Sequence, residues 1–341
     1  MVLVSSDFLN VVFILIAAIS ALILPFELFL FSYAFLGPIH YLTEINWLNS
    51  RKFFAKSKLP IYLIISATLA LSLLYFTNYF QLSPSFLSKQ RLASMATYAI
   101  LLSFVFVLFT ELLSEKLTIS KYPQIFIFFM SLLLTVILLR KNYQVHLVTF
   151  VFLPTLIHVF LFTFFFMWFG YLKKPNSLGL LSLVLMLIIP LAIAFLPFEI
   201  FNFNTSTAAI DTYSNSGFQT LNRVLYSIFD SSITTETNFY ETIKGIKIQS
   251  FIAFAYTYHY LNWFAKINIV GWAKSISKIN LLVILCLWGL AVGLYIYNFK
   301  IGLLALFFMS LGHVLLEFPL NIKVMKGILS HYHIKFKAYW G

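Results

Sequence analysis

Residues 178–198 read LGLLSLVLMLIIPLAIAFLPF, and no charged side chain interrupts them. A helix of about 20 apolar residues is long enough to cross the hydrocarbon core of a bilayer. Backbone N–H and C=O groups in lipid must be hydrogen-bonded within the segment itself, which favours a helix. This stretch therefore predicts a membrane-spanning helix.

Similar apolar runs recur along the whole chain. Hydrophobic residues make up 61% and charged residues 10% of the 341 residues, and the mean hydropathy is +0.92. We predict one all-α, polytopic transmembrane helical bundle over residues 1–341 with about nine spans. The spans are roughly 8–36, 60–80, 93–113, 122–140, 144–170, 178–198, 247–265, 279–298 and 301–320.

The first span is long for one crossing, and it leads into Gly37-Pro38. Proline removes a backbone donor, so we expect a break or kink there and His40 in the first turn of the next helix. The N-terminus has no basic region before its apolar run, which favours a retained first helix over a cleaved signal.

The net charge of +12 comes from basic residues spread through short loops between the apolar runs. This spread indicates membrane topology and contact with anionic lipid rather than nucleic-acid binding. The predicted inner loops hold 15 Lys and Arg residues and the outer loops eight. We therefore expect a multi-pass protein of a bacterial inner membrane, with its N-terminus outside and its C-terminus inside.

Residues 199–246 differ from the rest because they are rich in Ser, Thr and Asn. We predict a polar loop outside the membrane, with room for an interfacial helix within 215-NSGFQTLNRVLYSIFDSS-232. The single cysteine, Cys286, excludes an intrachain disulfide and a cysteine-based metal site.

Ionisable residues inside apolar runs are costly, so each is a candidate functional residue. They are Glu27, His40, Glu44, His158, His259, His313 and Glu317, and Glu111 and His146 lie near the ends of predicted helices. For Glu27 the alternatives are capping of backbone groups freed by Pro25 or pairing with a lysine. For His158 a simple helix–helix hydrogen bond is the alternative to a functional role.

Two of these pairs share one spacing, in 37-GPIHYLTEINW-47 and 312-GHVLLEFPLN-321. Residues four apart lie on one helical face, so each His lies beside its Glu. A third polar stretch, 256-YTYHYLNWF-264, surrounds His259 with aromatic residues. We expect Tyr258, Tyr260 and Trp263 to line a pocket for an apolar substrate.

Imidazole and carboxylate without thiolate suit iron, zinc or manganese. We predict that His40, His259 and His313 are metal ligands, and His158 is a candidate for a fourth. Glu44 and Glu317 are the candidate catalytic residues. They could bind the metal, orient the histidines or act as general bases, and we favour orientation of the histidines.

These three stretches resemble the Brp/Blh carotene-cleaving dioxygenases, a family of polytopic proteins with histidine-bound iron. The resemblance covers 38-PIHYLTE-44, 256-YTYHYLNWF-264 and 312-GHVLLE-317. It departs from the family pattern at Tyr41, at Asn262 or Trp263, and at Gly312. It implies Fe(II), dioxygen and a lipid-soluble substrate such as a carotenoid or another polyene.

Other classes of function remain open. A proton-coupled transporter or flippase would use the buried His and Glu residues as a relay. A hydrolase or lipid transferase would use them as acid and base. A scaffold subunit would use them only to join helices. A tightly bound transition metal distinguishes the oxygenase from the transporter.

Overall fold

The structure is a computed structural model that describes residues 5–53, 58–80, 89–113, 121–141, 156–197, 205–229, 239–267, 271, 273 and 276–340. Every regular element in these ranges is a helix, which confirms the predicted all-α class. The chain forms two compact units, residues 1–40 with 159–303 and residues 41–158 with 304–341. The single membrane domain expected over residues 1–341 stays a prediction.

The first unit contains the N-terminal helices and the middle of the chain. Its helices are α1 (Ser6–Ile23), α2 (Pro25–Phe31), the π-helix η1 (Ser32–Leu36), α8 (Thr163–Lys173), α9 (Ser177–Phe195), α10 (Thr207–Ser216), α11 (Gln219–Phe229), α12 (Ile243–Ala265) and α14 (Lys278–Tyr297). Several begin at a side-chain cap: Ser5 accepts the Phe8 N–H, and Asn176 accepts the Gly179 N–H. Such caps satisfy backbone donors that the first turn leaves without a partner.

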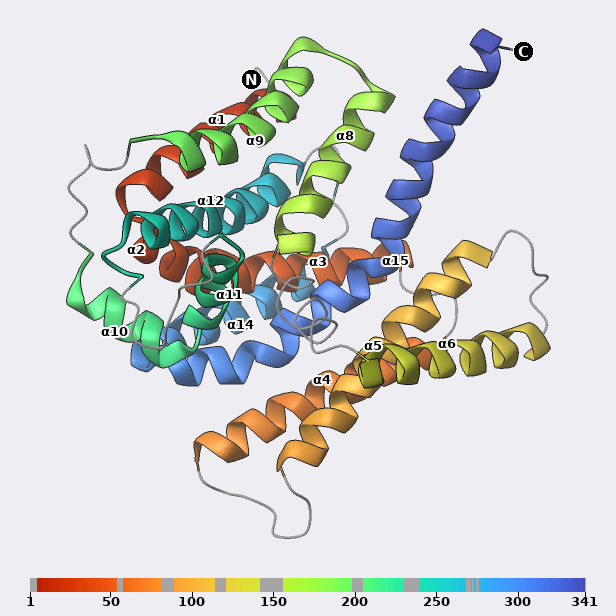
Figure 1. Ribbon diagram of the computed structural model, residues 1–341, viewed down its shortest axis with the longest axis horizontal. Coiled ribbons are helices and arrows are strands. Elements are labelled where there is room, and N and C mark those ends of the chain that lie inside the picture. The colour runs from red at the N-terminus through yellow and green to blue at the C-terminus, as the bar shows by residue number, and fades with distance from the viewer. Residues whose placement is uncertain are drawn as a thin grey trace. The chain divides into compact units, whose positions relative to one another are not determined.

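Helix α12 is the centre of the first unit. It packs against α1, α2, η1, α9 and α11, and Figure 1 shows α1, α9 and α12 side by side. Every side chain from residue 252 to residue 260 is buried. A helix buried on all sides shows no clear amphipathic pattern, because no face is reserved for solvent.

The polar segment predicted at 199–246 contains two short helices, α10 and α11, which pack against α2 and α12. The helix expected within residues 215–232 is α11. The turn between the two uses Gly217 with φ +84°, a left-handed conformation that favours glycine. Residues 199–204 and 230–238 of this segment lie outside the described residues.

A buried hydrogen-bond network fastens this pair of helices to α12. The Tyr213 hydroxyl lies 2.6 Å from Asn222 Oδ1 and 2.8 Å from Gln249 Oε1. Gln249 also donates from Nε2 to the Pro25 carbonyl at 3.1 Å. Burial raises the pKa of the Tyr213 phenol well above its ordinary value, so the hydroxyl stays protonated and can donate.

Glu27 has a structural contact within the same unit. Its Oε1 accepts hydrogen bonds from the Ser206 N–H at 2.9 Å and from the Ser206 hydroxyl at 3.1 Å. Ser206 is the N-cap residue of α10. Glu27 therefore holds the start of α10, which resembles the capping role considered for it, on a helix far along the chain.

The first predicted span, 8–36, is two helices rather than one. The chain leaves the helical conformation at Leu24 (φ −135°, ψ 62°), and Pro25 begins the next helix, where its ring is favoured. The break expected at Gly37-Pro38 is wrong, because the helix runs without interruption through η1 into α3 (Gly37–Arg51).

The π-helical turn explains how the helix passes Pro38. Proline cannot donate the backbone bond of an α-helix, and the wider turn of η1 lies directly before it. Trp288 donates from Nε1 to the Phe35 carbonyl at 2.9 Å. His40 lies in the first turn of α3, as the sequence predicts.

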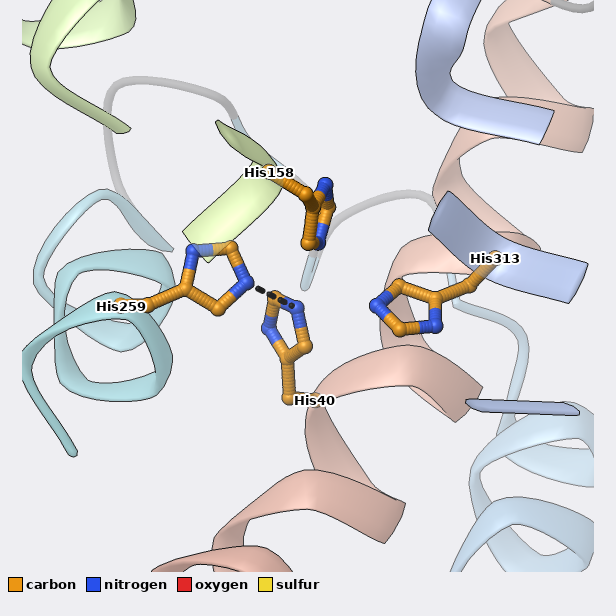
Figure 2. Close-up of side chains that lie close together, drawn as sticks. All are labelled: His40, His158, His259 and His313. Atoms are coloured by element: carbon orange, nitrogen blue, oxygen red, sulfur yellow. Dashed lines mark hydrogen bonds between the residues drawn. The ribbon is translucent and has the colours of Figure 1, made fainter. Parts of the chain in front are cut away.

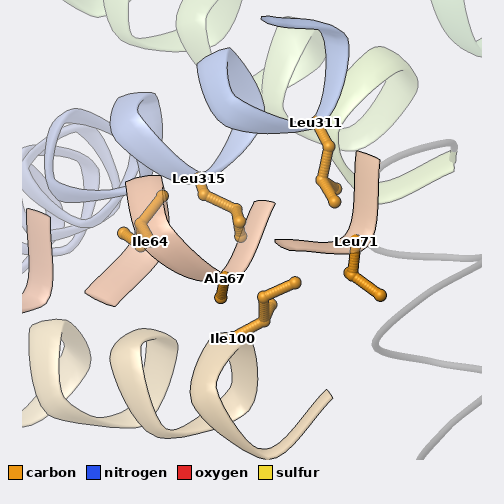
Figure 3. Close-up of a cluster of buried hydrophobic side chains, with 6 residues drawn as sticks. All are labelled: Ile64, Ala67, Leu71, Ile100, Leu311 and Leu315. Carbon is orange, nitrogen blue, oxygen red and sulfur yellow. The ribbon is translucent and has the colours of Figure 1, made fainter. Parts of the chain in front are cut away.

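The second unit contains most of α3, then α4 (Lys58–Tyr79), α5 (Lys89–Leu113) and α6 (Lys121–Lys141), and most of α15 (Phe299–Trp340). Helix α4 packs along α5, and α5 along α6. The buried residues of the core between α4, α5 and α15 are all aliphatic (Figure 3), and Phe104 and Phe307 pack against them. The buried residues are Ile64, Ala67, Leu71, Ile100, Leu311 and Leu315.

Two opposite faces of helix α15 lie in different surroundings. Leu311 and Leu315 are four residues apart and pack into the aliphatic core. His313 and Glu317 have the same spacing but follow two residues later, about 200° around the helix at 3.6 residues per turn. One face of α15 therefore packs in the core, and the opposite face carries the polar pair.

Six helices in the described part of the chain are long and apolar enough to cross a membrane. They are Ser6–Ile23, Pro25–Ser50, Leu156–Lys173, Ser177–Phe195, Lys278–Tyr297 and Phe299–His333. Shorter apolar helices at Ile61–Thr77, Tyr98–Leu112 and Ile125–Ile137 lie within three further predicted spans. The predicted span 247–265 coincides with α12, which is not among the six.

The six long apolar helices indicate a membrane protein. The nine spans predicted from the sequence are not confirmed. The predicted orientation depends on the number of crossings, so N-outside and C-inside stay predictions, as does the bacterial inner membrane.

The close approach of α12 to the segment before it predicts a stability effect. A Cβ on Gly245 would collide with the buried backbone of Phe239, whereas a Cβ on Gly293 in α14 meets nothing within 4 Å. We expect Gly245→Ala to destabilise the protein by about 1–3 kcal/mol through overpacking. Gly293→Ala should leave the free energy of unfolding unchanged or raise it by up to about 1 kcal/mol. Thermal unfolding in detergent compares the two, and equal melting temperatures would contradict the proposed contact.

Candidate metal centre

His40 and His259 meet through their Nε2 atoms, which lie 3.1 Å apart (Figure 2). His40 projects from the first turn of α3 and His259 from α12. On the other side of the His259 ring, Nδ1 lies 2.8 Å from the Thr163 hydroxyl at the start of α8. Thr163 and both histidines are buried. His259 is therefore held through both of its ring nitrogens.

His158 and His313 form a second pair, with ring centroids 5.0 Å apart. His158 Nδ1 lies 3.0 Å from Glu317 Oε2, and Asn321 Nδ2 donates to the same oxygen at 3.3 Å. His313 Nδ1 lies 3.3 Å from the Met309 carbonyl, one turn earlier on α15. Each ring is thus contacted at Nδ1 by an oxygen atom.

The four histidines predicted as metal ligands lie together. One ligand nitrogen from each of His40, His158, His259 and His313 lies within 4.8 Å of the other three, and Figure 2 shows the rings pointing toward a common centre. Their exposed fractions are 1%, 1%, 8% and 5%, respectively. Four buried imidazoles converging in this way form a cluster that could bind a metal ion.

The spacing of the nitrogens can be compared with that around an ion. With metal–nitrogen bonds of about 2.0–2.1 Å, two ligand nitrogens are roughly 3.3 Å apart in a tetrahedral site and roughly 4.2 Å apart when opposite. The His40–His259 separation of 3.1 Å matches neighbouring ligands. All four ligand nitrogens lie within 4.8 Å of one another, a bound that exceeds the distance between opposite ligands by roughly half an ångström. The His40–His259 pair therefore has the spacing of two neighbouring metal ligands.

The contacts at Nδ1 also suit metal binding. A histidine that binds through one nitrogen usually donates its other N–H to an oxygen, which sets the tautomer and the ring direction. Thr163, Glu317 and the Met309 carbonyl offer such oxygens to His259, His158 and His313. In all three cases this leaves Nε2 as the metal-binding nitrogen.

Glu44 and Glu317 are both buried, at 2% and 7% exposed, and their carboxyl groups lie close enough to influence each other's charge. Two neighbouring carboxyl groups in an apolar interior disfavour being ionised together. Glu317 contacts His158 directly, which is the orienting position favoured from the sequence. The sequence paired Glu317 with His313 instead, because spacing alone cannot show contacts with other helices.

The three predicted pocket residues lie in different surroundings. The Tyr260 and Trp263 rings lie 5.2 Å and 5.7 Å from the His40 ring. The Tyr258 hydroxyl has partners outside the cluster, at 3.1 Å from Met167 Sδ and 2.9 Å from Asn262 Nδ2. Their role in substrate binding stays a prediction, and Tyr41, with its ring 5.6 Å from His313, joins the aromatic neighbours.

Thr163 was not predicted from the sequence, because threonine is common in apolar helices. The one feature of the sequence that could have identified it is its position five residues after His158. Glu111 is buried at the end of α5, where Lys326 donates to its backbone carbonyl, and it is not one of the clustered residues. His146 lies outside the described residues.

Comparison with protein-family profiles, with curated proteins and with solved structures finds no match to this chain. The resemblance to the carotene-cleaving dioxygenases therefore stays a prediction from three short motifs.

Glu317 supplies the one carboxylate that contacts a clustered histidine in a described hydrogen bond or ion pair. We expect Glu317→Gln to weaken metal binding by about 10–100-fold, the usual effect of changing a group that orients a ligand. Competition with a chromophoric chelator measures this affinity. The matched control is Glu27→Gln, since Glu27 binds Ser206 instead, and its metal affinity should stay at the wild-type value. Equal losses in both variants would contradict a specific role for Glu317.

Proposed function

We propose that this chain is an integral-membrane, non-haem iron oxygenase that acts on a lipid-soluble substrate such as a carotenoid or another polyene. The single observation that carries the proposal is the convergence of four buried histidines from separate parts of the chain. Buried imidazoles are costly in an apolar interior unless they are hydrogen-bonded or bind a metal. A shared metal ion accounts for all four at once.

The donor set supports iron. Imidazole nitrogens suit iron, copper, zinc and nickel, whereas magnesium and calcium prefer oxygen ligands. His40, His158, His259 and His313 would hold the ion, and Glu317 and Thr163 would orient two of them. Iron is the choice within this group because the three histidine motifs resemble those of iron-dependent dioxygenases.

The bound iron would supply activation of dioxygen. Cleavage of one carbon–carbon double bond by dioxygen places one oxygen atom on each carbon and yields two carbonyl groups, so no external reductant is needed. Aromatic side chains at His40 and His313, namely Tyr41, Tyr260 and Trp263, suit an apolar, conjugated substrate. A substrate of this kind reaches the protein from the lipid.

Elemental analysis of the detergent-purified protein tests the metal site. We expect near-stoichiometric iron in the wild type and its loss in His313→Ala, because a site of three histidines binds less tightly than a site of four. The matched control is His333→Ala, an exposed histidine on the same helix, which should keep its iron. A folded wild type that binds no transition metal would overturn the proposal and favour a proton-coupled transporter, which needs no metal.

Oxygen uptake tests the reaction itself. The iron-loaded protein should consume dioxygen when a polyene is added in detergent, with one dioxygen used for each double bond cleaved. His259→Ala should reduce uptake to background, and His333→Ala should retain it. An oxygen electrode and chromatography of the carbonyl products provide the measurements. Iron-loaded protein that is inactive across carotenoids, retinoids and other polyenes would contradict the substrate class.

A further inference from the structure

We infer that Thr163 is the positioning residue of His259, and that a π-helical turn brings it to the cluster. The inference rests on the proposed metal site and adds to it a residue that no histidine or carboxylate motif identifies. The Thr163 hydroxyl accepts a hydrogen bond from the Nδ1–H of His259, which directs Nε2 toward the metal.

The contact is close and buried. Thr163 Oγ1 lies 2.8 Å from His259 Nδ1, with Thr163 4% and His259 8% exposed. His259 Nε2 lies 3.1 Å from His40 Nε2, so Nε2 is the nitrogen on the side of the cluster. A metal bound there requires the proton on Nδ1, and the hydroxyl oxygen is the acceptor for that proton.

The backbone explains why this threonine faces the cluster. Residues 156–162 form a π-helical segment that contains His158, and α8 begins at Thr163. Five residues around an α-helix turn about 500°, which would place His158 and Thr163 roughly 140° apart. In a π-helix residues five apart are hydrogen-bonded and lie nearly above each other. The π-helical turn therefore places a ligand and the residue that orients another ligand on one face.

The two oxygen groups differ in charge character. His158 is held by a carboxyl group of the Glu44–Glu317 pair, and His259 by a neutral hydroxyl. A carboxylate partner makes an imidazole a stronger donor than a hydroxyl does. His259 is thus oriented without an added negative charge, as is His313 at the Met309 carbonyl.

Cobalt(II) binding to the metal-free full-length protein tests this role, with the dissociation constant and the visible spectrum of the bound ion as readouts. We expect Thr163→Val to weaken binding by about 10–100-fold and to alter the spectrum, because the ring of His259 loses its acceptor. Thr163→Ser keeps the hydroxyl and should restore both readouts to near wild type.

The matched control is Thr257→Val on α12. Thr257 also forms a buried side-chain hydrogen bond of 2.8 Å, to Ser32, but contacts no clustered histidine in that bond. Wild-type affinity in Thr257→Val together with the loss in Thr163→Val supports the assignment. Unchanged binding in Thr163→Val, or equal losses in both valine variants, overturns it while the metal site stands. A wild type that binds no cobalt overturns the assignment and the metal site together.

Discussion

Buried imidazole nitrogens require hydrogen-bonding or metal partners, and the arrangement of the helices around the four histidines depends on this requirement. Four histidine rings lie in an interior built largely from aliphatic and aromatic side chains, and each ring has two nitrogens that prefer to be hydrogen-bonded or to bind a metal. The partners come from distant positions: Thr163 for His259, Glu317 for His158, and the His40–His259 contact itself. Residues far apart in the sequence are therefore fixed around the same rings.

Irregular helix turns accompany this arrangement. The π-helix η1 ends at Leu36, shortly before His40, and the π-helical segment 156–162 contains His158. Such turns are rare and occur frequently at functional sites. A π-helical turn changes the direction of the side chains within it and after it, so the directions of His158 and His40 both depend on a local departure from α-helical geometry. The contacts at η1, Ser32 to Thr257 and Trp288 to Phe35, stabilise one of these departures.

The sequence predicts the helical class, the polar segment at 199–246 and the four clustered histidines, because apolar runs and rare ionisable residues within them are strong signals. It does not predict the break at Leu24, since Pro25 and Pro38 are both reasonable helix starts. It also cannot single out Thr163. Most hydroxyls in these helices bond their own backbone, as Thr68 does with the Ile64 carbonyl, and only the folded chain shows which one reaches a histidine.

The grouping of partners around the histidines has a consequence for the proposed substrate. Glu44 and Glu317 are buried close to each other, and two carboxyl groups so placed disfavour a second negative charge. Four neutral imidazoles and a divalent ion would then leave a site with a net positive charge of about one, which the interior solvates poorly. A neutral, apolar substrate adds no further charge to be desolvated, and it gains contact with Tyr260 and Trp263 beside His40. A cationic substrate would increase the uncompensated charge, so the electrostatics of the cluster and its aromatic neighbours favour the same class of substrate.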